Sequence, residues 1–133
     1  MTIADLHIHS NFSDGSDSIE ELAKKIKLAG IKYFALTDHD TIAGCSHMDT
    51  IIDKEIQFIP AVELTCLAGE IKCHILGYNC DYTNSTLLGL IAKGKDLRRK
   101  KLEVRINYLR DIVVYKKDVC RVKDIKERNG ISY

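Results

Sequence analysis

The sequence predicts an α/β fold in which parallel strands alternate with helices. Two observations carry this prediction: strand-like apolar segments alternate with a segment of helical periodicity, and the chemically distinctive polar residues fall within or just after the strand-like segments. The chain has 133 residues, of which 45% are hydrophobic, enough for the core of one domain or of part of a larger one.

The first predicted strand runs from Ile3 to His9. At the two-residue period of a strand, His7 and His9 point to one face, while Leu6 and Ile8 point to the other. Two imidazoles on one face, about 7 Å apart, can reach a single cation. Taken alone, a pair of this kind also fits chance on a half-exposed strand, so its meaning depends on the residues that follow.

A polar, turn-rich loop from Ser10 to Asp17 leads into the first predicted helix. Ser18 and Glu21 have the spacing of a capping box, which marks a helix start. The apolar residues that follow keep helical spacing, at Ile19, Leu22, Ala23, Ile26 and Ala29, and Gly30 supplies the stop.

A compact, aromatic-rich run from Tyr33 to Leu36 predicts a buried strand that ends in the polar residues 37–40. The order strand, helix, strand implies a parallel pair. Parallel sheets and barrels place their active sites at the carboxyl ends of the strands.

The next segments predict a less regular helix from Thr41 to Asp53 and a strand from Gln57 to Thr65, with Glu63 at its far end. A further strand from Lys72 to Tyr78 carries His74.

From Ser85 onward, apolar spacing predicts one or two amphipathic helices with a possible break at Gly94, and then a short helix from Lys117 to Arg128. We place a sub-domain boundary near Ala92. Up to that residue the chain has 13 acidic and 6 basic residues, and beyond it 6 acidic and 14 basic.

The segment from Lys93 to Arg105 contains seven basic and two acidic residues. It fits either a solvated helix face or a surface on which Arg98, Arg99 or Arg105 meets substrate phosphate. The sequence names no single substrate-binding residue.

Five cysteines, without a Cys-x-x-Cys pair, argue against a disulfide framework or a zinc finger. The equal spacing of Cys66, Cys73 and Cys80 fits a soft-metal set, or more simply buried structural thiols. The sequence shows neither a membrane-spanning apolar run nor a signal peptide, so the expected location is the cytoplasm.

Six residues in this pattern are candidate metal ligands, four imidazoles and two carboxylates that suit zinc, manganese or iron. Without further information they fit either a metal site or polar groups satisfied within a core. A carboxylate such as Glu63 can bridge two cations about 3.5 to 4 Å apart. The candidates are His7, His9, Asp14, His39, Glu63 and His74.

Four motifs, in this order and at these spacings, resemble the PHP (polymerase and histidinol phosphatase) family of metal-dependent phosphoesterases. They are Asp5-Leu6-His7-Ile8-His9-Ser10, Thr37-Asp38-His39-Asp40, Pro60-Ala61-Val62-Glu63 and His74-Ile75-Leu76-Gly77-Tyr78. Asp14-Gly15 and the run from Asp38 to Thr41 are most similar to the subgroup of nucleoside 3',5'-bisphosphate phosphatases and 5'-to-3' exoribonucleases.

The resemblance implies the first part of a distorted seven-stranded β/α barrel over residues 1–92, followed by a basic helical insertion, or lid, over residues 93–133. It implies up to three divalent metals (Zn, Mn or Fe). His7, His9 and Glu63 would hold the first, Glu63 and His74 the second, and Asp14 and His39 the third.

The implied reaction is hydrolysis of a phosphomonoester of a nucleotide, or of a 5' nucleic-acid end, by metal-activated hydroxide. Its catalytic residues would be His7, His9, His39 and Glu63. Asp38 and Asp40 are expected to orient His39 or a bound water.

This sequence lacks the family's later ligands, a histidine in a Gly-Arg-Pro-His-like motif and a terminal Asp-x-His. It is therefore expected to represent the N-terminal half of a PHP protein. The alternative is a catalytically incomplete remnant that serves as a metal-binding or assembly module. The expected partners are a phosphorylated small molecule or a short RNA or DNA 5' end, and a second half-barrel or a second copy of the chain, without a membrane.

Overall fold

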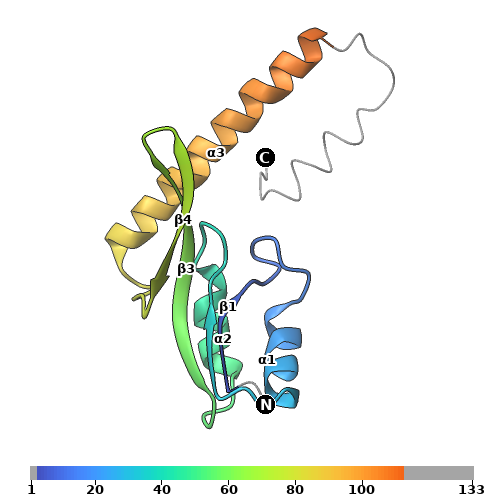
Figure 1. Ribbon diagram of the computed structural model, residues 1–133, viewed down its shortest axis with the longest axis vertical. Helices are drawn as coiled ribbons and strands as arrows, with labels where there is room; N and C mark the ends of the chain where they lie inside the picture. Colours follow the sequence, from blue (N-terminus) through green and yellow to red (C-terminus); the bar gives the residue numbers. More distant parts are fainter. Residues whose placement is uncertain (1–2, 113–133) are drawn as a thin grey trace. The chain divides into compact units, whose positions relative to one another are not determined.

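The computed structural model of the chain describes residues 3–112, which form four strands and three helices (Figure 1). The chain divides into two compact units, residues 1–91 and 92–133. In chain order the elements are β1 (Ala4–Ile8), α1 (Ile19–Leu28), β2 (Tyr33–Leu36), α2 (Ala43–Ile51), β3 (Gln57–Ala68), β4 (Ile71–Tyr78) and α3 (Ser85–Ile112).

The four strands form one sheet in the order β1-β2-β3-β4. β1 pairs with β2 and β2 with β3 in parallel, which confirms the predicted parallel pair and the α/β class. β3 changes partner along its length: residues 57–60 pair with β2, whereas residues 61–68 pair with the antiparallel β4. Glu63 lies just after this change, so it faces residues from both halves of the sheet.

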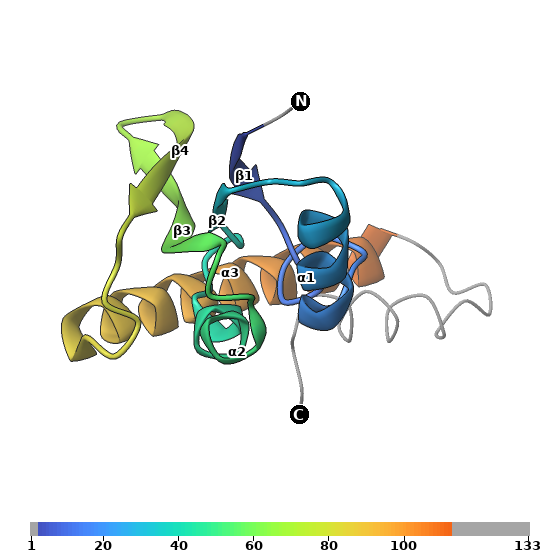
Figure 2. The ribbon, with the colours of Figure 1, turned by 90° about the horizontal axis from the view of Figure 1, so that it is seen from below.

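The core of the first unit lies between the sheet and the two helices α1 and α2, which cover the same face (Figure 2). Phe34 of β2 and Phe58 of β3 stack with ring centroids 5.1 Å apart. Ile19 and Met48 bring the two helices into the same cluster. Burying such side chains removes apolar area from water and fixes how the helices sit on the sheet.

The capping box at the start of α1 is confirmed. The Ser18 hydroxyl accepts a hydrogen bond from the Glu21 amide (3.2 Å), and the Glu21 carboxylate accepts one from the Ser18 amide (2.8 Å). After the helix, Gly30 has φ 68°, a left-handed conformation that glycine adopts without steric cost. The chain can therefore turn at once into β2.

Several boundaries differ from the sequence prediction. β3 continues past Thr65 to Ala68, because a tight hairpin with Gly69 at φ 63° pairs these residues with β4. α2 begins at Ala43. α3 continues through Gly94, which costs a helix about 1 kcal/mol relative to alanine but does not break it.

The predicted helix from Lys117 to Arg128 lies outside the described residues. None of the helices within residues 3–112 combines the length and apolar character needed to cross a bilayer.

Leu6, on the face of β1 opposite the histidines, stays 43% exposed, since β1 is an edge strand of the sheet.

Candidate metal centre

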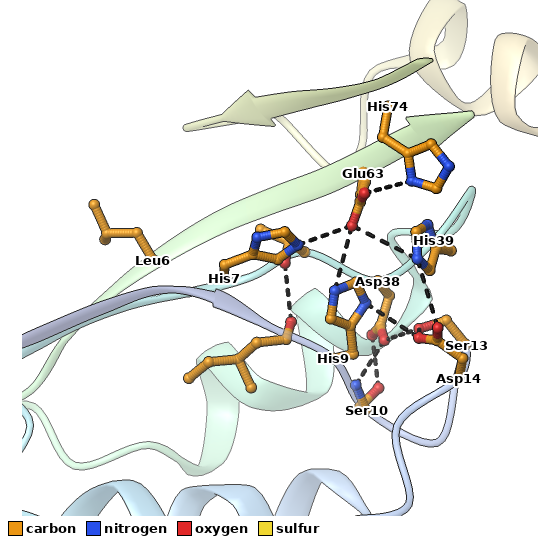
Figure 3. Close-up of polar contacts among 12 residues, drawn as sticks. Leu6, His7, His9, Ser10, Ser13, Asp14, Asp38, His39, Glu63 and His74 are labelled. Atoms are coloured by element: carbon orange, nitrogen blue, oxygen red, sulfur yellow. Dashed lines mark hydrogen bonds and ion pairs between the residues drawn. The ribbon is translucent and has the colours of Figure 1, made fainter. Parts of the chain in front are cut away.

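The candidate site is built around the carboxylate of Glu63, which is 5% exposed on β3 (Figure 3). Its Oε2 atom lies 2.9 Å from His7 Nε2, 3.3 Å from His9 Nε2 and 3.7 Å from His39 Nε2. Its Oε1 atom lies 2.6 Å from His74 Nδ1. One carboxylate therefore faces all four histidines that the sequence selected as ligands.

Backbone pairing brings these groups together from separate elements. β1 ends at Ile8, so His7 lies within the strand and His9 just after it. His39 follows β2 and forms an isolated parallel bridge with Glu63. In that bridge the Asp40 amide donates to the Glu63 carbonyl (2.9 Å), which fixes the imidazole beside the carboxylate.

Asp14, in the loop after β1, adds a second carboxylate. Its Oδ1 lies 3.3 Å from His9 Nδ1, and its Oδ2 lies 3.5 Å from His39 Nε2. Its side chain is 66% exposed, whereas that of Glu63 is 7% exposed. The site is thus closed beneath Glu63 and open at Asp14.

The ligand atoms form three overlapping groups, in each of which all atoms lie within 4.8 Å of one another. Glu63 belongs to two of them, and His9 and His39 also belong to two each. The groups are His7–His9–Glu63, His9–Asp14–His39 and His39–Glu63–His74.

His7 and His74 lie within hydrogen-bond distance of Glu63, whereas the contacts of His9 suit cations better than direct hydrogen bonds. His9 meets its two carboxylates at 3.3 Å, longer than the usual 2.7 to 3.2 Å of a hydrogen bond. Two atoms that each lie about 2.0 to 2.1 Å from one tetrahedral ion are separated by about 3.3 Å. The His9 contacts thus have the separation expected of two ligands of one ion.

The number of N–H groups on His9 also favours a bound cation. A neutral imidazole carries one N–H, yet both ring nitrogens of His9 face carboxylate oxygens. One of these contacts would set a lone pair against an anion unless the ring were protonated or a cation lay between. His39 Nδ1 is also buried without a hydrogen-bond partner among residues 3–112. The donor set therefore fits divalent metal ions.

The electrostatics keep Glu63 ionised. Burial raises the pKa of its carboxyl, but hydrogen bonds from His7 and His74 and the nearby His39 outweigh burial and leave the pKa below its ordinary value. At neutral pH the site therefore presents a negative carboxylate, as a metal ligand must be.

Asp38 contacts the loop after β1, and Asp40 contacts strand β3. Asp38 accepts hydrogen bonds from Ser10 and Ser13, and Asp40 accepts one from the Thr65 amide at 2.8 Å. Asp40 has φ 49°, a strained value for a non-glycine residue. That these residues orient His39 or a bound water stays a prediction.

No role was assigned from the sequence to Ser10 and Ser13, which donate hydrogen bonds to Asp38. Ser10 lies in a predominantly polar loop but is 0% exposed, and burial of that kind cannot be inferred from polarity. His47 lies on α2, 3.3 Å from Glu20, and belongs to none of the three groups. Tyr78 and Tyr82 donate hydrogen bonds to the Leu6 carbonyl and to Asp49.

Two sequence relatives are named for enzymes that act on RNA or on nucleotides. The chain is 39% identical over 99 residues to a 5'-3' exoribonuclease of Haemophilus influenzae, an alignment that covers 73% of this chain and 36% of the relative. It is 30% identical over 104 residues to a 3',5'-nucleoside bisphosphate phosphatase of Chromobacterium violaceum, covering 77% and 35%. The chain thus spans about a third of the length of these relatives.

Among solved structures, a protein of Bifidobacterium adolescentis assigned as a metal-dependent phosphoesterase superposes with a TM-score of 0.66 at 26% identity. The match covers 86% of this chain and 41% of the other, which confirms the fold as part of a larger α/β barrel-like architecture. The family model described as the PHP domain matches residues 5–118. This match includes all six candidate ligands, and the chain belongs to the PHP domain family.

Proposed function

We propose that this chain carries the metal centre of a phosphoesterase that hydrolyses a phosphomonoester of a nucleotide or of a 5' nucleic-acid end. The observation that carries the proposal is the position of Glu63, whose single carboxylate belongs to two of the three ligand groups. A carboxylate shared in this way can hold two cations close together, the arrangement found in enzymes that displace groups on phosphorus.

Zinc, manganese and iron all suit the six ligands, which combine imidazole with carboxylate. His7, His9 and Glu63 would hold one ion, His39, Glu63 and His74 another, and Asp14 with His9 and His39 a third. When bound, such ions lower the pKa of water and neutralise the charge of a phosphate group.

The protein's own residues determine where the substrate can approach. Glu63 is buried, whereas the side chains of His7 and Asp14 are 50% and 66% exposed. A phosphate can therefore reach the ligand groups from the side of these two residues, and His74, whose side chain is 36% exposed, is also accessible. Glu63 and Asp14 contribute two negative charges that offset part of the charge of the ions and keep the imidazoles in place.

The relatives suggest the class of substrate. A 5'-3' exoribonuclease and a 3',5'-nucleoside bisphosphate phosphatase are both named for cleaving phosphoesters of nucleotides or RNA. A nucleotide and a short RNA or DNA end present the same terminal phosphate, so one site can accept either. We propose the same class of substrate for the present chain.

The second candidate is a metal-binding or assembly module without catalysis. It is favoured by β1, an edge strand on which Leu6 is 43% exposed, and by the preceding Ile3, which is 61% exposed. An edge of this kind can pair with another polypeptide, either a second half-barrel or a second copy of the chain.

The two candidate functions predict different results in an assay of metal content and hydrolysis. The 133-residue chain is purified without chelator, its metal content is measured by elemental analysis, and hydrolysis of a nucleoside 3',5'-bisphosphate is followed on the same sample. Metal together with phosphate release supports the enzyme, whereas bound metal without release, also after Mn²⁺ is added, supports the module. His47→Asn serves as the control, because His47 lies outside the ligand groups.

A further inference from the structure

The loop after β1 must hold the exposed side chain of Asp14 in a defined position. Its carboxylate is largely exposed, so packing around the side chain cannot hold it beside His9 and His39. Apart from a long contact in which the Ser13 hydroxyl donates to Asp14 Oδ1 (3.4 Å), the position of Asp14 is set through the backbone of its loop. The loop begins at Ser10, which is 0% exposed and so forms a fixed point within the protein.

That fixed point is held by Asp38, a carboxylate that is 1% exposed. Its Oδ1 accepts from the Ser10 amide (2.7 Å) and the Ser13 hydroxyl (2.6 Å), and its Oδ2 accepts from the Ser10 hydroxyl (2.6 Å). Hydrogen bonds to an ionised carboxylate are shorter and stronger than neutral ones. Asp38 therefore holds both ends of the segment that leads into Asp14 (Figure 3).

The rest of the loop is folded tightly onto Ser10. The amides of Ser13 and Gly15 both donate to the Ser10 carbonyl at 3.0 Å. A Cβ placed on Gly15 would lie 2.4 Å from the His9 carbonyl oxygen, so only glycine allows this close approach. Asp14 is thus held between two anchored residues, at a set distance from His9.

We propose that Asp38 is a positioning residue that, through Ser10 and Ser13, holds Asp14 beside His9 and His39 and so sets the metal occupancy of that one ligand group. This inference rests on the metal centre of the proposed function. It gives Asp38 a role through the loop, distinct from orienting the ring of its neighbour His39.

The inference requires a selective effect. Asp38 belongs to none of the three ligand groups, and the group His7–His9–Glu63 contains no residue of the loop after Ser10. Loosening the loop therefore weakens the Asp14 group and leaves the groups that depend on Glu63 in place. A general loss of stability would weaken all three.

Ser13→Ala tests this with little risk to folding, since it removes one hydroxyl from a partly buried loop position. Mn²⁺ binding is measured by isothermal titration calorimetry and by elemental analysis. We expect one class of Mn²⁺ site to weaken by about 10- to 100-fold, the range for loss of an outer hydrogen-bond partner, and the others to be unchanged. Ser13→Thr, which keeps the hydroxyl, restores wild-type binding.

Four further variants complete the experiment. Asp14→Asn removes the same site, and Asp14→Asn combined with Ser13→Ala removes nothing more, because both act on one group. Asp38→Asn weakens that site as Ser13→Ala does. Ser18→Ala, which loses the cap of α1, lowers stability without changing the Mn²⁺ sites, and so distinguishes positioning from a general structural effect.

The proposal is overturned if Ser13→Ala and Asp38→Asn bind Mn²⁺ like the wild type, if they weaken all sites alike, or if the wild type takes up no Mn²⁺. Bound Mn²⁺ without hydrolysis of a nucleoside 3',5'-bisphosphate counts against the proposed function alone. The pattern of site loss among the variants still decides the role of Asp38.

Discussion

At the scale of single residues, Glu63 concentrates the chemistry of the site. It is nearly buried, ionised, and within 3.7 Å of a ring nitrogen of each of four histidines. A buried carboxylate is costly unless it is paired, and here its partners are the same imidazoles that can bind metal. The folded protein thus holds an ionised carboxylate among these imidazoles before a cation binds.

Glu63→Gln should selectively remove the sites that share this residue. A neutral amide is a poor bridging ligand, so the affinity of the groups His7–His9–Glu63 and His39–Glu63–His74 should fall by more than about 100-fold. The group His9–Asp14–His39 lacks Glu63 and should keep an ion. Elemental analysis of the variant beside His47→Asn measures the difference. Unchanged metal content would refute the shared role of Glu63.

Cys45 gives a prediction for pH dependence. Its side chain is 1% exposed, and burial raises the pKa of the thiol to about 11 from an ordinary value of 9.0. The folded state therefore favours the protonated thiol: the contribution to stability is complete below pH 9 and is lost as the pH rises through 11. Relative to Cys45→Ala, the wild type should lose on the order of 2 kcal/mol across this interval.

Urea unfolding of both proteins at pH 7, 9 and 10.5 measures this loss. Lysines and tyrosines titrate equally in the two, so the difference between their free energies of unfolding isolates the thiol. Cys45→Ala is less stable at pH 7 because of the cavity it leaves, and the gap should narrow as the pH rises. A gap that stays constant with pH would contradict the assigned burial of Cys45.

At the scale of elements, local signals in the sequence predicted what local physics controls. The capping box of Ser18 and Glu21 gave the start of α1, and the period of two in β1 placed His7 and His9 on one side. The parallel pairing of β1 and β2 followed from the helix between them.

Features that depend on distant contacts were not predictable in this way. The pairing of β3 with β2 and the hydrogen bonds between Asp38 and Ser10 join residues more than twenty positions apart, and no local pattern encodes them. At Gly94 a local signal predicted a break that does not occur. This residue has low helix propensity but lies inside a helix of 28 residues, since its neighbours continue the hydrogen-bond ladder.

The cap of α1 can be tested directly. Ser18→Ala removes the hydroxyl that accepts from the Glu21 amide, and we expect it to lower the free energy of unfolding by about 1 kcal/mol. Ser18→Asp, which keeps an acceptor at the cap, should restore most of the stability. Chemical unfolding followed by circular dichroism provides the measurement. If alanine and aspartate behaved alike, the hydrogen bond would contribute nothing.

At the scale of the whole molecule, charge is distributed unevenly along the chain. The residues up to Ala92 carry a net negative charge and those after it a net positive one. The first unit holds the imidazoles and the two carboxylates of the candidate ligand groups, whereas the described part of α3 beyond Ala92 is basic and includes ion pairs of Arg99 and Lys100 with Asp96. Cations that bind the first unit offset its excess negative charge, and they should therefore stabilise its folded state.

Metal should therefore stabilise the whole chain. The ligands come from β1, the loops after β1 and β2, and from β3 and β4, so an ion that binds them joins segments far apart in the sequence. Since the unfolded chain lacks this arrangement, Mn²⁺ at about one hundred times its dissociation constant should add about 2.7 kcal/mol of stability. Thermal unfolding with and without Mn²⁺, and after addition of EDTA, measures the effect. Glu63→Gln should retain only a small part of the shift and His47→Asn the full shift, whereas equal shifts in both variants would place the bound metal elsewhere.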